Sequence, residues 1–434
     1  MRTIRIYKML TGMLAKLRRG LKSSYLRSVA MLFSGQFVAA AIPLITAPIL
    51  GRLYDPAHYG FLGLFMAASV TLGSVGNWQY SQGIIVEGRT RNACSLLHAC
   101  QFTSVLTALV SIPIAIYLVF FSGLLASEAR LFFLLLPPSV FLTGSLSALC
   151  AMATRNKRFR LLAINQVACV SLSAITAISM GSKGLQEFGL LTALIVGQLV
   201  NYTIIFCAHH RKDRVRCPVS FKRIKAMLRK HKDYAICTMP AVFVNSLNQQ
   251  LPVWFLGFAG ATGTLGLFNR ARQLMSMPVN LLSGSVAQVF QQRAAVDYKQ
   301  NGNCISIFRK TGLAILAAGL LPTILLAIWA PDLLVWFLGE KWRDAGAIAR
   351  ILAPMLLLRM VCSPLSTVFY IAGKQKEDVI LKVLAGVIVA VCVATGHFVF
   401  KSPYWMVAGF SVAFGATYIL YLVRGYQHAL GHAP

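Results

Sequence analysis

The chain has 434 residues, of which 57% are hydrophobic and only 12% are charged. A soluble protein of this length could not cover so much apolar surface with so few charges, so the composition indicates a membrane protein. The formal net charge of +30 would also suit a nucleic-acid-binding protein, but the basic residues are dispersed in short groups between apolar stretches. We therefore expect no nucleic-acid partner. The cysteines and histidines lack the spacing typical of zinc ligands, so we expect no bound metal.

Twelve apolar stretches follow one another along the chain, and most reach the roughly 20 residues that a helix needs to cross a bilayer. Backbone groups in lipid must be hydrogen-bonded internally, and these stretches lack the alternation of barrel strands. The sequence therefore predicts an all-α integral membrane protein. The predicted spans are 28–50, 61–86, 94–120, 131–151, 161–180, 188–207, 234–257, 264–290, 311–330, 345–372, 383–400 and 403–423.

The distribution of basic residues predicts the orientation. With the N-terminus inside, 32 of the 42 Lys and Arg residues fall in cytoplasmic segments, six in outside loops and four within spans. This asymmetry follows the positive-inside rule and predicts that both termini are cytoplasmic. Five of the six tryptophans, Trp342 among them, lie near predicted outer ends, as an interfacial aromatic belt would.

The spans divide into two sets of six, separated by the longest hydrophilic stretch. We predict five segments: a basic amphipathic N-terminal segment that binds membrane lipids, an N-lobe of spans 1–6, a basic cytoplasmic linker, a C-lobe of spans 7–12 and a cytoplasmic tail. Their ranges are 1–27, 28–207, 208–233, 234–424 and 425–434. The sequence Gly-Phe-Leu-Gly-Leu-Phe at 60–65 recurs as Gly-Thr-Leu-Gly-Leu-Phe at 263–268. Six spans per set give both lobes the same orientation, an arrangement that places a transporter's site in a central cavity between the lobes.

All four charges within the predicted spans are arginines, and none of the twelve Asp and Glu residues falls inside a span. An unpaired charge in hydrocarbon costs at least about 2.5 kcal/mol at mid-helix, so these side chains should face water or a bound anion. Guanidinium suits phosphate because its donors engage two oxygens at once. The predicted anion-binding residues of a cationic cavity are Arg270, Arg272, Arg350 and Arg359.

Position separates these four arginines. Arg359 lies mid-span, out of easy reach of either surface, whereas Arg270, Arg272 and Arg350 are near enough to an outer end to snorkel to the headgroups. Arg270 and Arg272 are also about 200° apart around one helix, so at most one of them faces a cavity squarely.

Further polar side chains interrupt the apolar pattern. Amides and an aromatic ring at this depth suit sugar hydroxyls and sugar faces, and equally suit hydrogen bonds between membrane helices. This set comprises Gln36, Asn77, Trp78, Gln79, Asn245 and Gln249. Two histidines within spans, His98 and His397, are candidates for proton coupling, although a lone membrane histidine is more often a packing residue.

Enzyme motifs are missing from the sequence. There is no Asp-x-Asp, no phosphate-binding glycine loop and no acid pair within a span, and no predicted outside loop is long enough for a catalytic domain. We therefore expect a protein that is not an enzyme and needs no cofactor.

Several stretches resemble the O-antigen and exopolysaccharide flippases of the multidrug/oligosaccharidyl-lipid/polysaccharide (MOP) exporter superfamily. The resemblance covers the whole chain in span count and is sharpest in spans one, two and eight. The matching stretches are 32–37, 43–48, 52–56, Tyr59-Gly60 and 263–290, the last including Asn269-Arg270, Pro278 and 282–290.

The resemblance implies a function. Such a flippase moves an undecaprenyl-diphosphate-linked oligosaccharide, an O-antigen or exopolysaccharide repeat unit, from the cytoplasmic to the periplasmic face of the bacterial inner membrane. Alternating access through a cationic cavity would carry it, with polysaccharide polymerase and assembly proteins as partners. By the same match, Arg270 resembles a cavity residue.

Two alternatives stay open at this point. A multidrug exporter of the same superfamily typically moves cations and would call for carboxylates within the membrane. A membrane-embedded polysaccharide polymerase or glycosyltransferase would call for a large external loop or an acidic metal site. Neither feature is found in the predicted spans and loops.

Overall fold

The computed structural model describes residues 24–120, 128–213 and 221–431. Within these ranges the chain is helical and has no strand, which confirms the predicted all-α membrane fold. Most of the amphipathic segment predicted at 1–27, and the last three residues of the tail, lie outside the described residues. Of the described helices, nine are long and apolar enough to cross a membrane.

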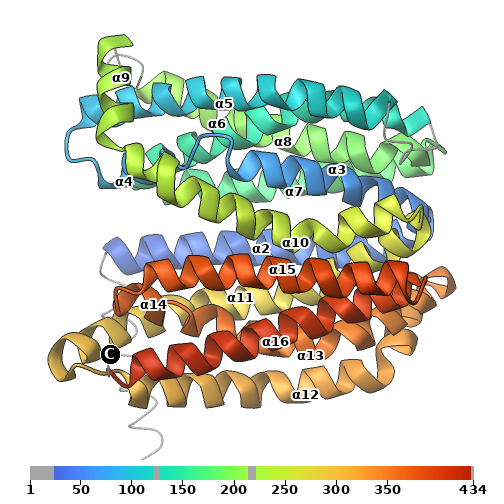
Figure 1. Cartoon of the computed structure of the whole chain (residues 1–434). Helices are drawn as coiled ribbons and strands as arrows, with labels where there is room; N and C mark the ends of the chain where they lie inside the picture. Colours follow the sequence, from blue (N-terminus) through green and yellow to red (C-terminus); the bar gives the residue numbers. More distant parts are fainter. Residues whose placement is uncertain (1–23, 121–127, 214–220, 432–434) are drawn as a thin grey trace, which may run out of the picture.

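The helices gather into two groups, which Figure 1 shows in the two halves of the molecule with α2 and α10 between them. We call the group from α2 to α8 the N-lobe. Its members are α2 (Ser24–Leu53), α3 (Pro56–Ser74), α4 (Ser81–Val86), α5 (Thr90–Phe120), the 3-10 helix η1 (Glu128–Leu135), α6 (Leu136–Arg155), α7 (Phe159–Ser182) and α8 (Gln186–Asp213).

We call the second group the C-lobe. Its members are the π-helical turn η3 (Tyr234–Thr238), α10 (Met239–Phe258), α11 (Thr262–Asn301), α12 (Ile305–Leu338), η4 (Glu340–Trp342), α13 (Arg343–Leu365), α14 (Val368–Ile371), α15 (Gln375–Phe398) and α16 (Pro403–Ala429). The short helix α9 (Phe221–Lys230) lies between the groups in sequence and packs on α5 of the N-lobe.

The start of α2, the C-terminus, α4, α9 and α14 all lie at one end of the bundle (Figure 1). The basic loops of the sequence predict that this end is cytoplasmic. The connection from α2 to α3 and the turn η4 lie at the opposite end (Figure 1).

Two predicted spans are interrupted in the structure. The stretch predicted at 61–86 breaks after Ser74, because Trp78 and Gln79 have positive φ angles of 49° and 61°, which no α-helix contains. Helix α4 then resumes. The stretch predicted at 345–372 divides into α13 and α14. In the span predicted at 61–86, the polar residues that lower its hydropathy are therefore the residues at which the helix breaks.

Three of the twelve predicted spans are not among these nine helices. They are the spans at 61–86, 234–257 and 264–290, which correspond to α3 plus α4, to α10 and to α11. These helices contribute most of the lining of the cavity described below. Of these helices α11 is the least apolar, and a helix that faces an aqueous cavity between lobes need not be apolar all round.

Candidate functional site

A cavity of about 370 Å³ lies between α3 of the N-lobe and α11 and α13 of the C-lobe. We call it the central cavity. Its N-lobe wall is mostly apolar and includes Leu62, Met66 and Val70, all on α3. Its C-lobe wall is polar and comprises Gln250, Asn269, Arg272, Gln273, Ser276, Asn280 and Arg359, together with Met277.

Two arginines from different helices converge on the central cavity. Arg272 of α11 donates to the backbone carbonyl of Gln249 over 2.8 Å and to its side-chain oxygen over 3.4 Å. Arg359 of α13 makes a long contact of 3.5 Å with the side-chain oxygen of Asn280. Because both side chains line the same cavity, their positive charges repel each other. Each has five N–H donors, so both retain donors for a ligand.

No carboxylate is among the residues that line the central cavity. The two like charges therefore have no internal counter-ion there, and bringing an anion between them would relieve their repulsion. Bidentate guanidinium donors suit a phosphate or diphosphate in particular.

Arg270 occupies a different position from the one that the sequence suggests. Its side chain is only 4% exposed, so it neither snorkels to the headgroups nor lines the central cavity. It donates to the carbonyl of Ala47 on α2 over 3.2 Å and lies 4.8 Å from the centre of the Tyr59 ring. Arg270 therefore joins the C-lobe to the N-lobe. Of the pair 270 and 272, Arg272 alone lines the cavity.

Beside this contact, buried polar atoms lack a partner within the described part of the chain. They are the hydroxyl of Tyr59, the side-chain nitrogen of Asn269 and Nε of Arg270. A buried polar group without a hydrogen bond costs about 1–3 kcal/mol, so such atoms are expected to gain partners in another state or from a ligand. Tyr59 and Asn269 both line the central cavity.

The internal sequence repeat forms the contact between the lobes. A Cβ atom added at Gly60 of α3 would lie 2.3 Å from the carbonyl oxygen of Thr262, and one at Gly266 of α11 would lie 1.6 Å from that of Pro56. These glycines let the two backbones touch, as small residues do between membrane helices. The two copies of the repeat therefore pack against each other at one end of the central cavity.

Trp342 closes the same end and corrects a prediction. It is fully buried, its indole N–H donates to the carbonyl of Gly51 over 2.8 Å, and its ring packs edge-on against Tyr59 at 5.2 Å. It is therefore a core residue between the lobes and not part of an interfacial belt. Sequence position near a span end could not distinguish these two environments.

Arg350 lies away from the central cavity. Its side chain is exposed and its guanidinium donates to the carbonyl of Ile328 on the neighbouring helix α12. This placement matches snorkelling at a helix end and leaves Arg350 out of the cationic site.

The polar residues predicted in span two stabilise the N-lobe itself. Asn77 is buried and donates to the carbonyl of Gly144 on α6 over 3.0 Å. The Trp78 indole donates to the hydroxyl of Thr107 on α5 over 3.2 Å, and Gln79 donates back to the carbonyl of Ser74. These hydrogen bonds stabilise the chain where the helix breaks. None of the three predicted residues lines the central cavity.

The remaining sequence candidates also lie outside the central cavity. Gln36 is exposed on α2. His98 is partly buried on α5, and His397 lines a separate pocket at the end of α15 beside Lys401. The structure brings neither histidine to Arg272 or Arg359, so a role in coupling stays a prediction.

A second cavity, of about 290 Å³, lies within the C-lobe and is lined by Asn245, Gln249 and Arg359 among others. It also exposes Asp378 and Lys382, which the sequence analysis placed before span eleven. Helix α15 begins at Gln375, so both residues are helical, and Asp378 is only 4% exposed. The span predicted at 383–400 therefore belongs to a helix that begins earlier, and Asp378 is a buried carboxylate on that helix. Its signal was the Asp-Lys pair spaced four residues apart, typical of a helix face.

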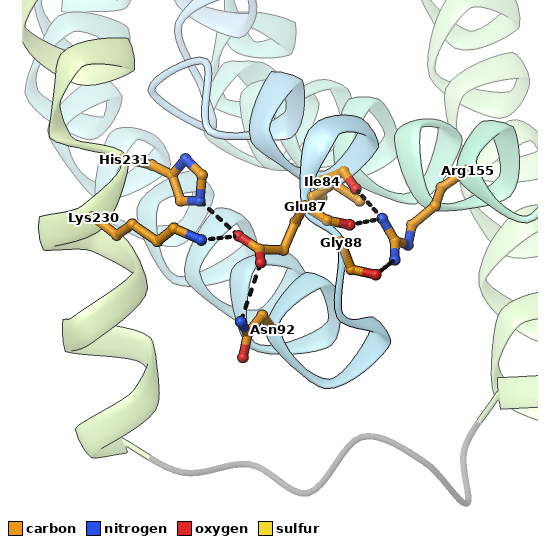
Figure 2. A network of polar contacts seen from close by, with 7 residues as sticks. All are labelled: Ile84, Glu87, Gly88, Asn92, Arg155, Lys230 and His231. Carbon is orange, nitrogen blue, oxygen red and sulfur yellow. Dashed lines mark hydrogen bonds and ion pairs between the residues drawn. The ribbon is translucent and has the colours of Figure 1, made fainter.

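A second buried carboxylate, Glu87, lies at the predicted cytoplasmic end of the N-lobe (Figure 2). It accepts hydrogen bonds from Lys230 at 2.6 Å and Asn92 at 3.1 Å, and it lies 3.1 Å from a ring nitrogen of His231. The hydrogen bond from Lys230 is the main cause that lowers the pKa of Glu87 to about 2. These contacts tie the end of α9 to the N-lobe.

Arg155 completes this network from the end of α6 (Figure 2). Its guanidinium donates to the carbonyls of Ile84, Glu87 and Gly88. The turn between α4 and α5 is therefore held from two sides.

The fold has solved counterparts among membrane transporters. The inward closed conformation of the lipid II flippase MurJ superposes with a TM-score of 0.70 at 14% identity, covering 92% of this chain and 90% of that one. The inward-facing conformation of a multidrug resistance MATE family transporter of the MOP superfamily gives 0.64 at 14% identity, covering 92% and 94%. The chain is thus a polytopic α-helical membrane protein with the architecture of MOP-superfamily transporters.

Within that class, residues 49–347 match the polysaccharide biosynthesis protein family, and the chain belongs to this family. It is also similar to the succinoglycan biosynthesis transport protein ExoT of Rhizobium meliloti (strain 1021), with 22% identity over 348 residues. That match covers 75% of this chain and 64% of the relative, so the chain spans less than two thirds of the relative's length.

Proposed function

We propose that the protein is a flippase that moves an undecaprenyl-diphosphate-linked oligosaccharide from the cytoplasmic to the periplasmic face of the bacterial inner membrane. The observation that supports this most directly is the convergence of Arg272 and Arg359 on a cavity that no carboxylate lines. A diphosphate supplies the negative charge that these two groups lack. The oligosaccharide is an O-antigen or exopolysaccharide repeat unit, in keeping with the family and with the transport protein that the chain resembles.

Transport proceeds by alternating access. The contacts of Gly60, Gly266, Arg270 and Trp342 all lie at the end where α2 passes into α3. The positive-inside rule predicts that this end is periplasmic. The lobes are then closed toward the periplasm, and the diphosphate enters the central cavity from the cytoplasmic side. Rocking of the lobes would separate the two glycine motifs and release the headgroup on the far side, where polymerase and assembly proteins take it over.

The contact between the lobes supports such a rocking motion. Buried polar atoms of Tyr59, Asn269 and Arg270 lack hydrogen-bond partners within the described chain, so the closed contact between the lobes leaves some hydrogen-bonding groups unpaired. Opening it would hydrate these atoms and offset part of the packing that is lost.

The test is export of polysaccharide in a strain deleted for this chain, complemented with variants at matched membrane levels. Arg272→Ala and Arg359→Ala should each lower export at least roughly tenfold, because each removes a charge-assisted contact to the diphosphate. Lysine at either position should restore part of it, since it returns the charge without the planar donors. Arg350→Ala is the matched control: it lies on the same helix as Arg359 but outside both cavities.

Equal export by wild type and both alanine variants would remove the cationic cavity from the mechanism. A loss with Arg350→Ala as large as with Arg359→Ala would point to a structural role for both.

A further inference from the structure

The second cavity of the C-lobe adjoins the central cavity. Arg359 lines both. Gln249 also connects them, because it accepts hydrogen bonds from Arg272 of the central cavity and lines the second cavity itself. A ligand group bound between Arg272 and Arg359 would therefore be continuous with whatever occupies the second cavity.

The second cavity contains an organised polar cluster around Asp378. One carboxylate oxygen accepts from Lys382 at 2.6 Å and from the hydroxyl of Tyr370 at 3.3 Å. The hydroxyl of Tyr421 is shared between the other carboxylate oxygen at 3.1 Å and the backbone carbonyl of Asp378 at 3.0 Å. Because Asp378 is buried and held from three sides, its orientation is fixed before any ligand arrives.

The charge of this cluster decides which ligands it can take. The ammonium of Lys382 already neutralises Asp378, so the site does not call for a further cation. An anion at the cluster itself would meet the carboxylate of Asp378, and the remaining positive charge, that of Arg359, lies where the cavity joins the central cavity. A neutral ligand rich in hydroxyl groups fits, because the cluster presents both donors and acceptors at fixed positions.

The unused hydrogen-bonding capacity of the lining residues matches such a ligand. Lys382 has three N–H donors and gives one to Asp378, while each carboxylate oxygen can accept more than one hydrogen bond. Asn245 is exposed to the cavity, and the rings of Phe414, Tyr418 and Tyr421 supply apolar faces. Most of the remaining lining is polar and includes the hydroxyl-bearing residues Ser363, Ser366 and Thr417, which suits a ligand rich in hydroxyl groups.

We propose that the second cavity binds the saccharide of the lipid-linked oligosaccharide, at the sugar that follows the diphosphate. Arg359 lies at the junction and contacts the diphosphate, while the cluster around Asp378 contacts the sugar hydroxyls. The inference rests on the proposed function and adds the place where the protein senses the sugar.

The test compares two lipids on the purified full-length protein in lipid nanodiscs. One probe is undecaprenyl diphosphate without sugar, and the other is the undecaprenyl-diphosphate-linked repeat unit from a polymerase-deficient strain. Tryptophan fluorescence gives the Kd of each, and their ratio is the sugar preference. The variants are Asp378→Asn, Tyr370→Phe and Asn245→Ala. The last two alter half-exposed or exposed side chains, so their folding is not in question.

Wild type should bind the sugar-bearing lipid at least about tenfold more tightly than the sugar-free lipid, the effect of one or two hydrogen bonds to a charged partner. Asp378→Asn and Asn245→Ala should lower this ratio several-fold and leave the Kd for undecaprenyl diphosphate unchanged. Arg272→Ala should weaken both lipids equally.

An unchanged ratio in all three variants would overturn the inference, as would an equal loss for both lipids in Asp378→Asn. Binding of Na⁺ that Asp378→Asn abolishes, with the sugar preference intact, would overturn it in favour of a cation site. The proposed function fails separately, when wild type does not bind undecaprenyl diphosphate or Arg272→Ala binds it as tightly.

Discussion

The two lobes place their polar side chains in opposite ways. In the N-lobe, Asn77, Trp78 and Gln79 form hydrogen bonds within their own lobe, and the wall of α3 that faces the central cavity is mostly apolar. In the C-lobe, Arg272 and Arg359 line the cavity. This difference shows that a polar residue in a membrane span is a candidate for ligand binding only when its hydrogen-bonding groups are not already paired with residues of its own lobe.

The buried carboxylates show the same contrast. Glu87 is paired with Lys230, which lies outside the spans at the end of α9, and it holds that helix to the N-lobe. Asp378 is paired with Lys382 one turn further along its own helix and lines a cavity. The first pair joins two structural elements, and the second leaves its surroundings open to a ligand.

The largest effect is expected where the two lobes touch. Gly266→Ala places a methyl group against the carbonyl of Pro56, which would force the glycine motifs apart and prevent closure. Export should fall roughly tenfold or more, as expected for a loss of about 1–3 kcal/mol of packing. A cysteine probe at the predicted periplasmic end should become more reactive toward a membrane-impermeant maleimide.

Gly263→Ala is the matched control for this prediction. It lies one turn earlier on the same helix, and an added Cβ there has no atom within 4 Å among the described residues. Equal effects of the two substitutions would show that the loss comes from helix α11 and not from the contact between lobes.

A smaller effect, and one on stability alone, is expected in the N-lobe. Asn77→Ala removes the side-chain hydrogen bond to the carbonyl of Gly144 on α6, which should cost about 0.5–1.5 kcal/mol and lower the thermal midpoint of the purified protein by a few degrees. Export per folded molecule should match wild type, measured against the amount of protein in the membrane. Loss of export at normal stability would contradict this difference between the lobes and would show that Asn77 takes part in transport.

The smallest effect concerns the pH dependence of stability. The folded-state pKa of Glu87 is lowered from 4.5 to about 2, so its ion pair stabilises the protein fully above the ordinary pKa and loses this contribution as the pH falls toward 2. The difference in thermal midpoint between wild type and Glu87→Gln should therefore shrink as the pH falls below about 4.5.

Glu340→Gln is the control for Glu87→Gln. The hydrogen bond from Arg343 lowers the pKa of Glu340 as well, but this side chain is exposed. Exposed ion pairs contribute little, so this variant should match wild type at every pH. A difference that persists unchanged to pH 3 for Glu87→Gln would mean that the charge of Glu87 is not what holds α9.

Local sequence features determined the class of this protein. Long apolar stretches predicted an all-α membrane fold, and the stretches around Gly60 and Gly263 identified the superfamily. These features succeed because hydropathy and backbone satisfaction in lipid are properties of each segment taken alone. Helix boundaries were determined less well: α12 and α15 begin earlier than predicted, and the spans predicted at 61–86 and 345–372 are interrupted. For α15, the charges of Asp378 and Lys382 resemble a loop until their burial is known.

The assignment of individual residues depended on tertiary structure. Arg270 and Arg272 are two positions apart and have similar sequence surroundings. Arg270 nevertheless donates to Ala47 of the other lobe, whereas Arg272 lines the central cavity. Asn77 and Asn245 are both amides within predicted spans, yet one is buried against Gly144 and the other faces the second cavity. Helical periodicity gives the angle between two side chains, but what each of them meets is set by how distant helices pack, which no single segment encodes.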